Sequence, residues 1–286
     1  MEVYKIPIGD IAENSINYLI LHFKPLFVSV ESSILFVNGC LKMMFLLVPP
    51  WGIIAMFVFL SWRLMGRKKS LFTLMSLLLL WNLGLWTSMM LTLSLVITAV
   101  CFSLLVAIPL GILAAESRLV GSLLRPVLDF LQAMPRFIYL IPGVVAFGID
   151  TVPGIVATMT LAIPPPVRLT ALGLTQIDKE VIEAGEAFGC NRWKLLCKIK
   201  FPLAIPSIML GINQCIMMSL SMVVIAALIG AGGLGADIVY AINRLLAGTA
   251  IVAGLGVVVL AILIDRLSKG LIAKRIARLR GRKINI

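Results

Sequence analysis

Seven long apolar runs follow one another along this chain, each close to the length that a helix needs to cross a membrane. A spanning helix takes about 20 residues, because the apolar core of a bilayer is about 30 Å thick. Only 13% of the residues are charged and 60% are apolar, whereas about a quarter are charged in soluble globular domains. The sequence therefore predicts an all-α integral membrane protein. The runs lie at 43–62, 71–87, 89–115, 126–147, 150–172, 203–229 and 248–267.

We therefore expect about seven spans, with six as the alternative, because the run at 71–87 is short and carries Asn82. The first residues, MEVYKIPIGDIAEN, are mixed in charge and have no apolar centre, so we expect no cleavable signal there. The pattern divides the chain into three parts. They are an external or interfacial segment at 1–42, a transmembrane domain at 43–268 and a basic cytoplasmic tail at 269–286.

Basic residues predict the orientation of these spans. If the first span runs from outside to inside, most of the 25 lysines and arginines fall in inner loops or in the tail. Positive residues accumulate on the cytoplasmic side of membrane proteins. We therefore expect the N-terminus outside and the C-terminus in the cytoplasm. The basic residues behind the net charge of +12 then fix the orientation of the spans and contact anionic lipid headgroups. We therefore expect no nucleic-acid partner.

A polar stretch, EAGEAFGCNRWKLLCKIKFP, interrupts the apolar pattern at 183–202. Asp178 is placed to cap a helix through KEVIEAGEAF, and Gly189 is placed to end that helix in the left-handed conformation. Asn191 is placed to cap a second helix, RWKLLCKIKF, which Pro202 joins to the next span. The sequence thus predicts a cytoplasmic helical hairpin. Such a hairpin can dock in a groove of another protein, or it can pack as a solvated loop on its own bundle.

The hairpin resembles the EAA loop of binding-protein-dependent ABC importer permeases. The pattern of that loop is E-A-A, three residues, G, nine residues and then I-x-L-P. This sequence departs from it at two positions, where Gly185 replaces alanine and Phe201 replaces leucine, and both replacements keep the small or apolar character. We assign a coupling loop to residues 177–202. The positions in register are Glu183, Ala184, Gly185, Gly189, Ile199, Phe201 and Pro202.

Other stretches are similar to the permease subunit of glycine betaine, proline and choline uptake systems. The similarity covers about residues 20–270. It implies the type I ABC importer permease fold and a place in the bacterial inner membrane. Methionine and sulfonate importers share many of these sequence features, so a permease for one of those solutes is the alternative. The stretches are LLRPVLDFLQAMPRFIYLIPGVVAFGI, AIPPPVRLTALGLTQI, MMSLSMVVIAALIGAGGLG and VVVLAILIDRLSKG.

The resemblance implies several partners. Two permease chains would form the pore, as a homodimer or as a pair of different chains. A cytoplasmic ABC ATPase would bind the loop and hydrolyse ATP, and an extracytoplasmic solute-binding protein would deliver the solute. The chain has no G-x-x-x-x-G-K-[ST] phosphate loop, so we expect neither a cofactor nor catalytic residues in it.

The resemblance also implies a role for each loop residue. Glu183 would contact the ATPase, while Ala184 and Gly185 would let the two surfaces approach closely. Gly189 would set the bend of the hairpin. The remaining matched residues, Ile199 and Pro202, would tie the loop to the following span.

Arg136 lies near the middle of the run at 126–147. A charged residue at the bilayer centre costs about 2.5–3.5 kcal/mol on insertion scales, so it must face the bundle interior or water. Asp129 lies on roughly the same helix face and is placed to share a polar network with Arg136. We therefore interpret Arg136 either as a structural partner or as part of the solute path. Asn213, Gln214, Ser219 and Ser221 are further candidates for the path, or else polar contacts between helices.

Two other functional classes fit the sequence less well. An ion-coupled secondary transporter usually buries carboxylates near the membrane midplane, whereas the acidic residues here lie near span ends or in loops. A membrane enzyme needs a catalytic group with a partner. The single histidine, His22, has no cluster of cysteines or carboxylates around it, so we expect no metal site.

Overall fold

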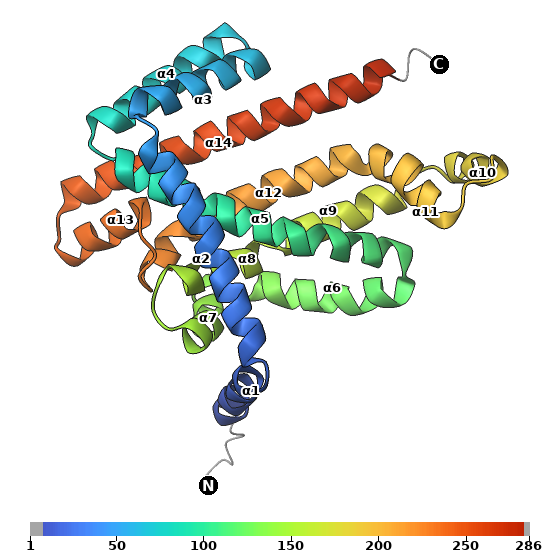
Figure 1. Cartoon of the computed structure of the whole chain (residues 1–286), viewed down its shortest axis with the longest axis horizontal. Coiled ribbons are helices and arrows are strands. Elements are labelled where there is room, and N and C mark those ends of the chain that lie inside the picture. Colours follow the sequence, from blue (N-terminus) through green and yellow to red (C-terminus); the bar gives the residue numbers. More distant parts are fainter. Residues whose placement is uncertain (1–7, 283–286) are drawn as a thin grey trace.

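The computed structural model describes residues 8–282, and over that range the chain is built of helices joined by short turns, without a β-strand. Figure 1 shows most of these helices running roughly along one long axis. This is the all-α architecture that the sequence predicts. The helices are α1 Ile8–His22, α2 Lys24–Leu47, α3 Pro50–Met65, α4 Arg67–Asn82, α5 Trp86–Glu116, α6 Arg118–Ala133, η1 Arg136–Tyr139, α7 Leu140–Phe147, α8 Thr151–Ala162, α9 Pro164–Thr175, α10 Lys179–Ala187, α11 Arg192–Leu195, η2 Leu196–Lys200, α12 Phe201–Ala227, α13 Leu234–Asn243 and α14 Ala247–Arg282.

The centre of the bundle is formed by α5, α9 and α12, which pack closely because glycines lie between them. A side chain at Gly111 of α5 would come within 2.6 Å of Thr170 Cβ on α9. A side chain at Gly173 of α9 would come within 2.7 Å of Ser207 Cβ on α12. Small residues of this kind let helix backbones approach each other in membranes, where dispersion contacts drive association.

Five helices are long and apolar enough to cross a membrane, or six if one bent pair counts as a single span. The predicted count of about seven is therefore too high, and the alternative of six agrees with the upper number. The runs at 43–62 and 71–87 are not among these candidates, because α3 and α4, which overlap them, have only 16 residues each, whereas α2, which was not predicted as a span, is one of them. The five are α2, α5, α8 with α9, α11 with η2 and α12, and α14 as far as Lys274.

The run at 126–147 does not form one straight span. Met134 precedes Pro135 and has an extended backbone with ψ 136°, as the residue before a proline prefers. The chain therefore breaks after α6, and η1 with α7 continues at an angle of 111°. Arg136 begins η1 and is exposed. Its predicted place at the middle of a continuous span is wrong.

The N-terminal helices lie at the edge of the bundle. In Figure 1, α2 crosses the other helices obliquely, and α3 and α4 form an antiparallel pair beside α14. The boundary predicted between residues 42 and 43 falls inside α2, which is one of the helices that could cross a membrane. The assignment of residues 1–42 to the outer interface stays a prediction.

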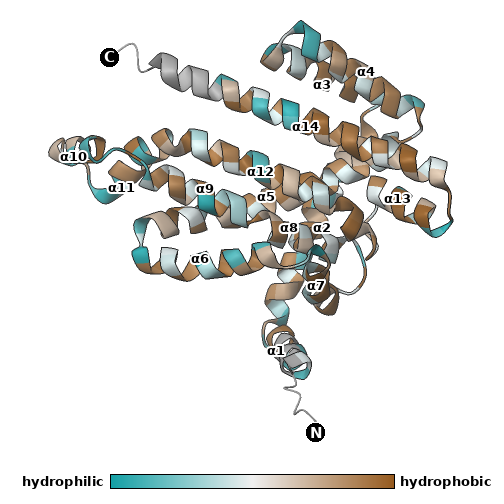
Figure 2. Cartoon of the chain, turned by 180° about the vertical axis from the view of Figure 1, so that it is seen from behind, coloured by the Kyte–Doolittle hydropathy of each residue, from teal (hydrophilic) through white to brown (hydrophobic). Residues whose placement is uncertain are grey.

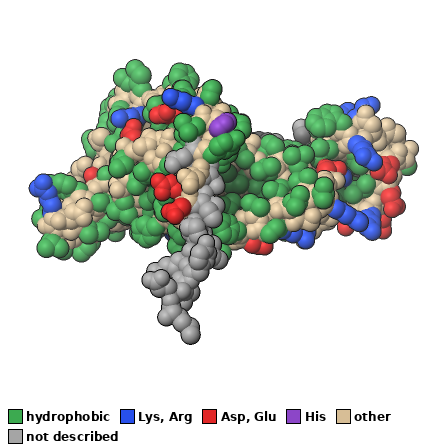
Figure 3. Space-filling view, turned by 90° about the horizontal axis from the view of Figure 1, so that it is seen from below, with side chains coloured by type: hydrophobic (Ala, Val, Ile, Leu, Met, Phe, Trp, Pro, Cys, Tyr) green, Lys and Arg blue, Asp and Glu red, His purple; other side chains and the backbone are tan. Residues whose placement is uncertain are grey.

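The surface is apolar along the helices and charged at one end. Figure 2 shows hydrophobic residues on the outer sides of most helices and hydrophilic residues around α10 and α11. Figure 3 shows hydrophobic side chains over much of one face and a group of lysine, arginine and acidic side chains at one end. The predicted basic tail begins as a helix, since α14 continues to Arg282, and residues 283–286 lie outside the described part.

Candidate functional site

The predicted helical hairpin is present at one end of the bundle, where α10 and α11 stand beyond the other helices (Figure 1). Gly189 adopts φ +77°, which confirms its predicted left-handed conformation. Asn191 caps α11 as predicted, because its side-chain oxygen accepts a hydrogen bond from Lys194 N at 2.8 Å. Asp178 occupies the N-cap position of α10, but its side chain makes no capping hydrogen bond. The bend of the hairpin is thus fixed by Gly189 and Asn191.

Gly185 packs against its own chain. The residue is buried, and a side chain there would lie 2.6 Å from Ile199 Cδ1 and 2.8 Å from Leu195 Cδ1. The sequence analysis assigned both Ala184 and Gly185 to close approach by a partner. In the structure Ala184 is exposed, whereas Gly185 lets α10 lie on the helix that follows. Both nearby atoms are ends of flexible side chains, so the alanine of the usual pattern also fits this position.

The outer side of the hairpin exposes large aromatic rings. Phe188 is 89% exposed and Trp193 is 71% exposed. Glu183 and Ala184, which precede Phe188 in the chain, are also exposed. We call these four residues the hairpin surface. Aromatic side chains concentrate at the centres of protein interfaces, so exposed rings on a charged, hydrophilic hairpin indicate a surface that a partner covers.

The second helix of the hairpin continues into the membrane span without a break. Its last part, η2, is a π-helix in which Phe201 N donates to Leu196 O, five residues earlier. The predicted joining of RWKLLCKIKF to the next span at Pro202 agrees with this continuous helix, Arg192–Ala227. Pro202 lies in the first turn of α12, and the π turn before it relaxes the hydrogen-bond ladder that a proline interrupts. The hairpin is thus joined to α12 by one continuous helix, Arg192–Ala227.

An ion pair ties the base of the hairpin to α5. Lys200 Nζ lies 2.7 Å from Glu116 Oε1, and the two side chains are 17% and 39% exposed. Glu116 is the last residue of α5. The sequence analysis missed this pair, because the two residues are far apart in the chain and only the packing of the helices brings them together. The hairpin is therefore linked to α12 by the backbone and to α5 by charge.

The predicted path residues on α12 fall on two faces. Asn213 Nδ2 donates to Asp265 Oδ1 at 3.3 Å, and Asn213 Oδ1 accepts from Ser268 Oγ, so Asn213 joins α12 to α14. Ser219 is buried, and its hydroxyl donates to Cys215 O. The Asn213 contacts are the polar link between helices that was the alternative, whereas the Ser219 hydroxyl bonds only within α12.

Gln214 and Ser221 lie on the other face of α12 and are exposed. The Ser221 hydroxyl donates to Met218 O in its own helix. Leu210, Met217 and Leu228 are exposed at helical spacing with them. This face of the most central helix is thus open in the single chain, and its mixture of polar and apolar groups keeps both residues as candidates for the path.

Asp129 pairs with Arg168 on α9. The predicted network of Asp129 with Arg136 is wrong, because the bend after α6 carries Arg136 away from the face that Asp129 occupies. Arg168 was missed at the sequence level, since 39 residues separate it from Asp129. Only a prediction that α6 packs on α9 would have found the pair.

The described residues contain no group of three or more His, Cys, Asp or Glu side chains that could hold a metal ion. His22 contacts only its own helix in these interactions: its Nδ1 donates to Tyr18 O at 3.0 Å, and its ring stacks on Tyr18. These contacts occupy the imidazole locally.

Comparisons with known proteins agree on one family. Residues 107–278 match the family described as "Binding-protein-dependent transport system inner membrane component". The glycine betaine/proline betaine transport system permease protein ProW of Escherichia coli is 40% identical over 97% of this chain and 78% of that protein. The glycine betaine/carnitine transport permease protein GbuB of Listeria monocytogenes is 47% identical over 78% of this chain and 80% of that protein.

Solved structures agree on the fold. The MetNI methionine ABC transporter, in inward-facing conformations, contains a chain that matches with a TM-score of 0.58. That match covers 67% of this chain and 95% of the other, at 19% identity. At this identity the match shows the fold alone.

Proposed function

The chain belongs to the family of binding-protein-dependent transport system inner membrane components, and we propose that it is the permease subunit of an ATP-driven importer for glycine betaine or a related osmoprotectant. It has the type I ABC importer permease fold. The observation that carries the solute class is the similarity, at 40% identity over 97% of the chain, to a permease of glycine betaine and proline betaine. Methionine is not favoured, since the methionine transporter is only 19% identical.

In this proposal the hairpin surface binds a cytoplasmic ABC ATPase, and a separate extracytoplasmic protein delivers the solute. Two permease chains form the pore as a homodimer. Closure of the ATPase pair on ATP moves the hairpin and thereby shifts the pore between two states, because a partner can bias a two-state element by binding its states with different affinity. The continuous helix from Arg192 to Ala227 supports this transmission.

The arrangement of charged residues supports the proposed orientation. The hairpin, the turn between α5 and α6, and the far end of α14 lie at the same end of the bundle (Figure 1). Arg118, Lys179 and Arg192 lie at this end, at the starts of their helices. Positive residues favour the cytoplasmic side. The ATPase would thus meet the hairpin in the cytoplasm, with the C-terminus on the same side.

The import experiment tests the proposal directly. The permease is co-expressed with the ATPase and the solute-binding protein encoded beside it, and the purified complex is reconstituted in proteoliposomes. We expect uptake of labelled glycine betaine that requires both internal ATP and the binding protein, and little uptake of labelled methionine. Uptake without ATP but with a sodium or proton gradient would contradict an ATP-driven importer and favour an ion-coupled transporter.

The Glu116–Lys200 pair gives a second test. Replacing Glu116 by lysine places two like charges together at the base of the hairpin, so we expect solute-stimulated ATP hydrolysis to fall several-fold. The double variant Glu116→Lys, Lys200→Glu restores opposite charges and is expected to recover most of the stimulation. Such partly exposed pairs contribute about 0.2–1 kcal/mol. Equal stimulation in the single and double variants would show that the pair does not hold the hairpin base.

A further inference from the structure

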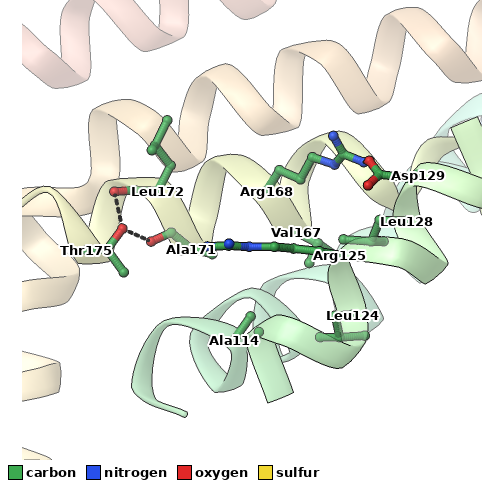
Figure 4. A pocket seen from close by; sticks show the side chains of 11 residues that line it. Ala114, Leu124, Arg125, Leu128, Asp129, Val167, Arg168, Ala171, Leu172 and Thr175 are labelled. Atoms are coloured by element: carbon green, nitrogen blue, oxygen red, sulfur yellow. Dashed lines mark hydrogen bonds and ion pairs between the residues drawn. The ribbon is translucent and has the colours of Figure 1, made fainter. Parts of the chain in front are cut away.

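A cavity of about 330 Å³ lies between α5, α6 and α9. Figure 4 shows Arg125 and Asp129 of α6, and Arg168 and Thr175 of α9, on its walls. Its volume is near the lower end of the range of small-molecule sites, which runs from about 300 to 1,000 Å³. We call it the α6–α9 cavity. It lies toward the end of the bundle that carries the hairpin, because α6 begins and α9 ends there.

Contact with lipid tails is unfavourable for the charged residues of this cavity. Along α6, Arg125 lies about 10 Å and Asp129 about 16 Å beyond Arg118, at 1.5 Å per residue. The side chains of Asp129 and Arg168 are nevertheless 67% and 42% exposed in the single chain. Charges within a membrane span face the bundle interior or a water-filled cavity, because hydrocarbon cannot solvate them. The open side of the α6–α9 cavity therefore borders the aqueous route or the second permease chain.

The cavity is lined by two arginines and one carboxylate, Arg125, Arg168 and Asp129. Arg168 pairs with Asp129 and holds its carboxylate in place. Arg125 makes no ion pair among the described residues, and in Figure 4 its side chain extends along the cavity toward Ala171. The rest of the wall is largely apolar, with Leu124, Leu128 and Leu172.

We propose that the α6–α9 cavity is a subsite on the inward side that holds a small zwitterion, with a carboxylate at Arg125 and a quaternary ammonium beside Asp129, before release into the cytoplasm. This inference rests on the proposed function. A free guanidinium can bind a carboxylate through two parallel hydrogen bonds. The methyl groups of a quaternary ammonium are apolar on the outside, so they pack on the leucine wall while the positive charge lies beside Asp129, which also stays paired with Arg168. Both halves of the zwitterion thus find complementary groups within one cavity.

Binding of glycine betaine to the solubilised complex tests this subsite. The complete permease–ATPase complex, without the solute-binding protein, is studied by saturation-transfer difference NMR on the methyl protons of glycine betaine. We expect a transfer signal that Arg125→Gln lowers about fivefold, since an exposed charge contact is worth at most about 1 kcal/mol. The probe 3,3-dimethylbutanoate, which has carbon in place of nitrogen, is expected to give a weaker signal than glycine betaine, because it lacks the positive charge that Asp129 attracts.

Two variants make the result specific. Arg118→Gln removes the same charge from the same helix outside the cavity, and we expect it to leave the signal unchanged. Asp129→Asn is expected to remove the preference for glycine betaine over 3,3-dimethylbutanoate. Arg125 makes no ion pair with any residue that the structure describes, so its replacement removes no such contact and the complex is expected to assemble normally.

The outcomes separate this subsite from the proposed function. A wild-type signal in Arg125→Gln would overturn the subsite, while ATP-driven uptake by the same preparation would leave the proposed function standing. Loss of co-purified phospholipid in Arg125→Gln, with an unchanged glycine betaine signal, would assign the cavity to a lipid headgroup and also overturn the subsite. Absence of ATP-driven glycine betaine uptake by the wild-type complex would overturn both.

Discussion

Alanine at both Phe188 and Trp193 is expected to detach the ATPase from the permease and to abolish solute-stimulated ATP hydrolysis. The two rings are 89% and 71% exposed, so their removal costs the permease itself little packing. Buried aromatic anchors at interfaces contribute about 2 kcal/mol or more each, which corresponds to a loss of affinity of about 30-fold for each ring. Co-purification of the ATPase with a tagged permease, and ATP hydrolysis with and without the loaded binding protein, measure the effect.

The matched control is Phe137→Ala. Phe137 is 59% exposed but lies in η1, away from the hairpin, so its loss is expected to leave ATPase co-purification unchanged. Glu183→Lys probes the charge of the same surface, and we expect it to lower stimulated hydrolysis while the chain still inserts in the membrane. An ATPase that stays bound and stimulated in the Phe188, Trp193 double variant would show that the hairpin surface is not the docking site.

The hairpin could be predicted because its geometry is local. Gly189 and Asn191 act within a few residues of the chain, through a left-handed turn and a capping hydrogen bond. The contact of Gly185 with Leu195 and Ile199 is also near in sequence. This contact was not predicted, because the sequence pattern shows that Gly185 is small but does not show which side of the helix it faces.

The errors in the predicted spans have a different cause. Apolar runs give the length of hydrophobic sequence, but they do not show where a helix ends. Pro135 is a local sequence feature that indicates the break between α6 and η1. Taking this proline into account would have divided the run at 126–147. The pairs Asp129–Arg168 and Glu116–Lys200 depend on packing between distant helices, so no local pattern contains them.

Alanine at Gly233 is expected to prevent the formation of a stable permease. Gly233 has φ +95°, and an added Cβ would lie 2.4 Å from Thr92 Oγ1, 2.9 Å from Thr92 N and 3.0 Å from Ser88 O. Two of these atoms belong to the backbone of α5 and cannot rotate away. The Thr92 hydroxyl also accepts from Leu234 N at 2.8 Å in a buried contact. With ψ −160°, this backbone conformation is essentially restricted to glycine and costs another residue about 1–3 kcal/mol, and overpacking costs about 1–3 kcal/mol more.

Thermal unfolding of the detergent-solubilised permease, followed by fluorescence-detected gel filtration, measures this effect. We expect Gly233→Ala to lower the unfolding temperature strongly or to leave no folded peak. Gly254→Ala is the matched control, because nothing lies within 4 Å of its added Cβ and its φ is not positive. In a helix this change is worth up to about 1 kcal/mol of stabilisation, so Gly254→Ala is expected to unfold at the wild-type temperature or above. Equal unfolding temperatures for both variants would mean that α5 and the turn before α13 do not pack as closely as the structure shows.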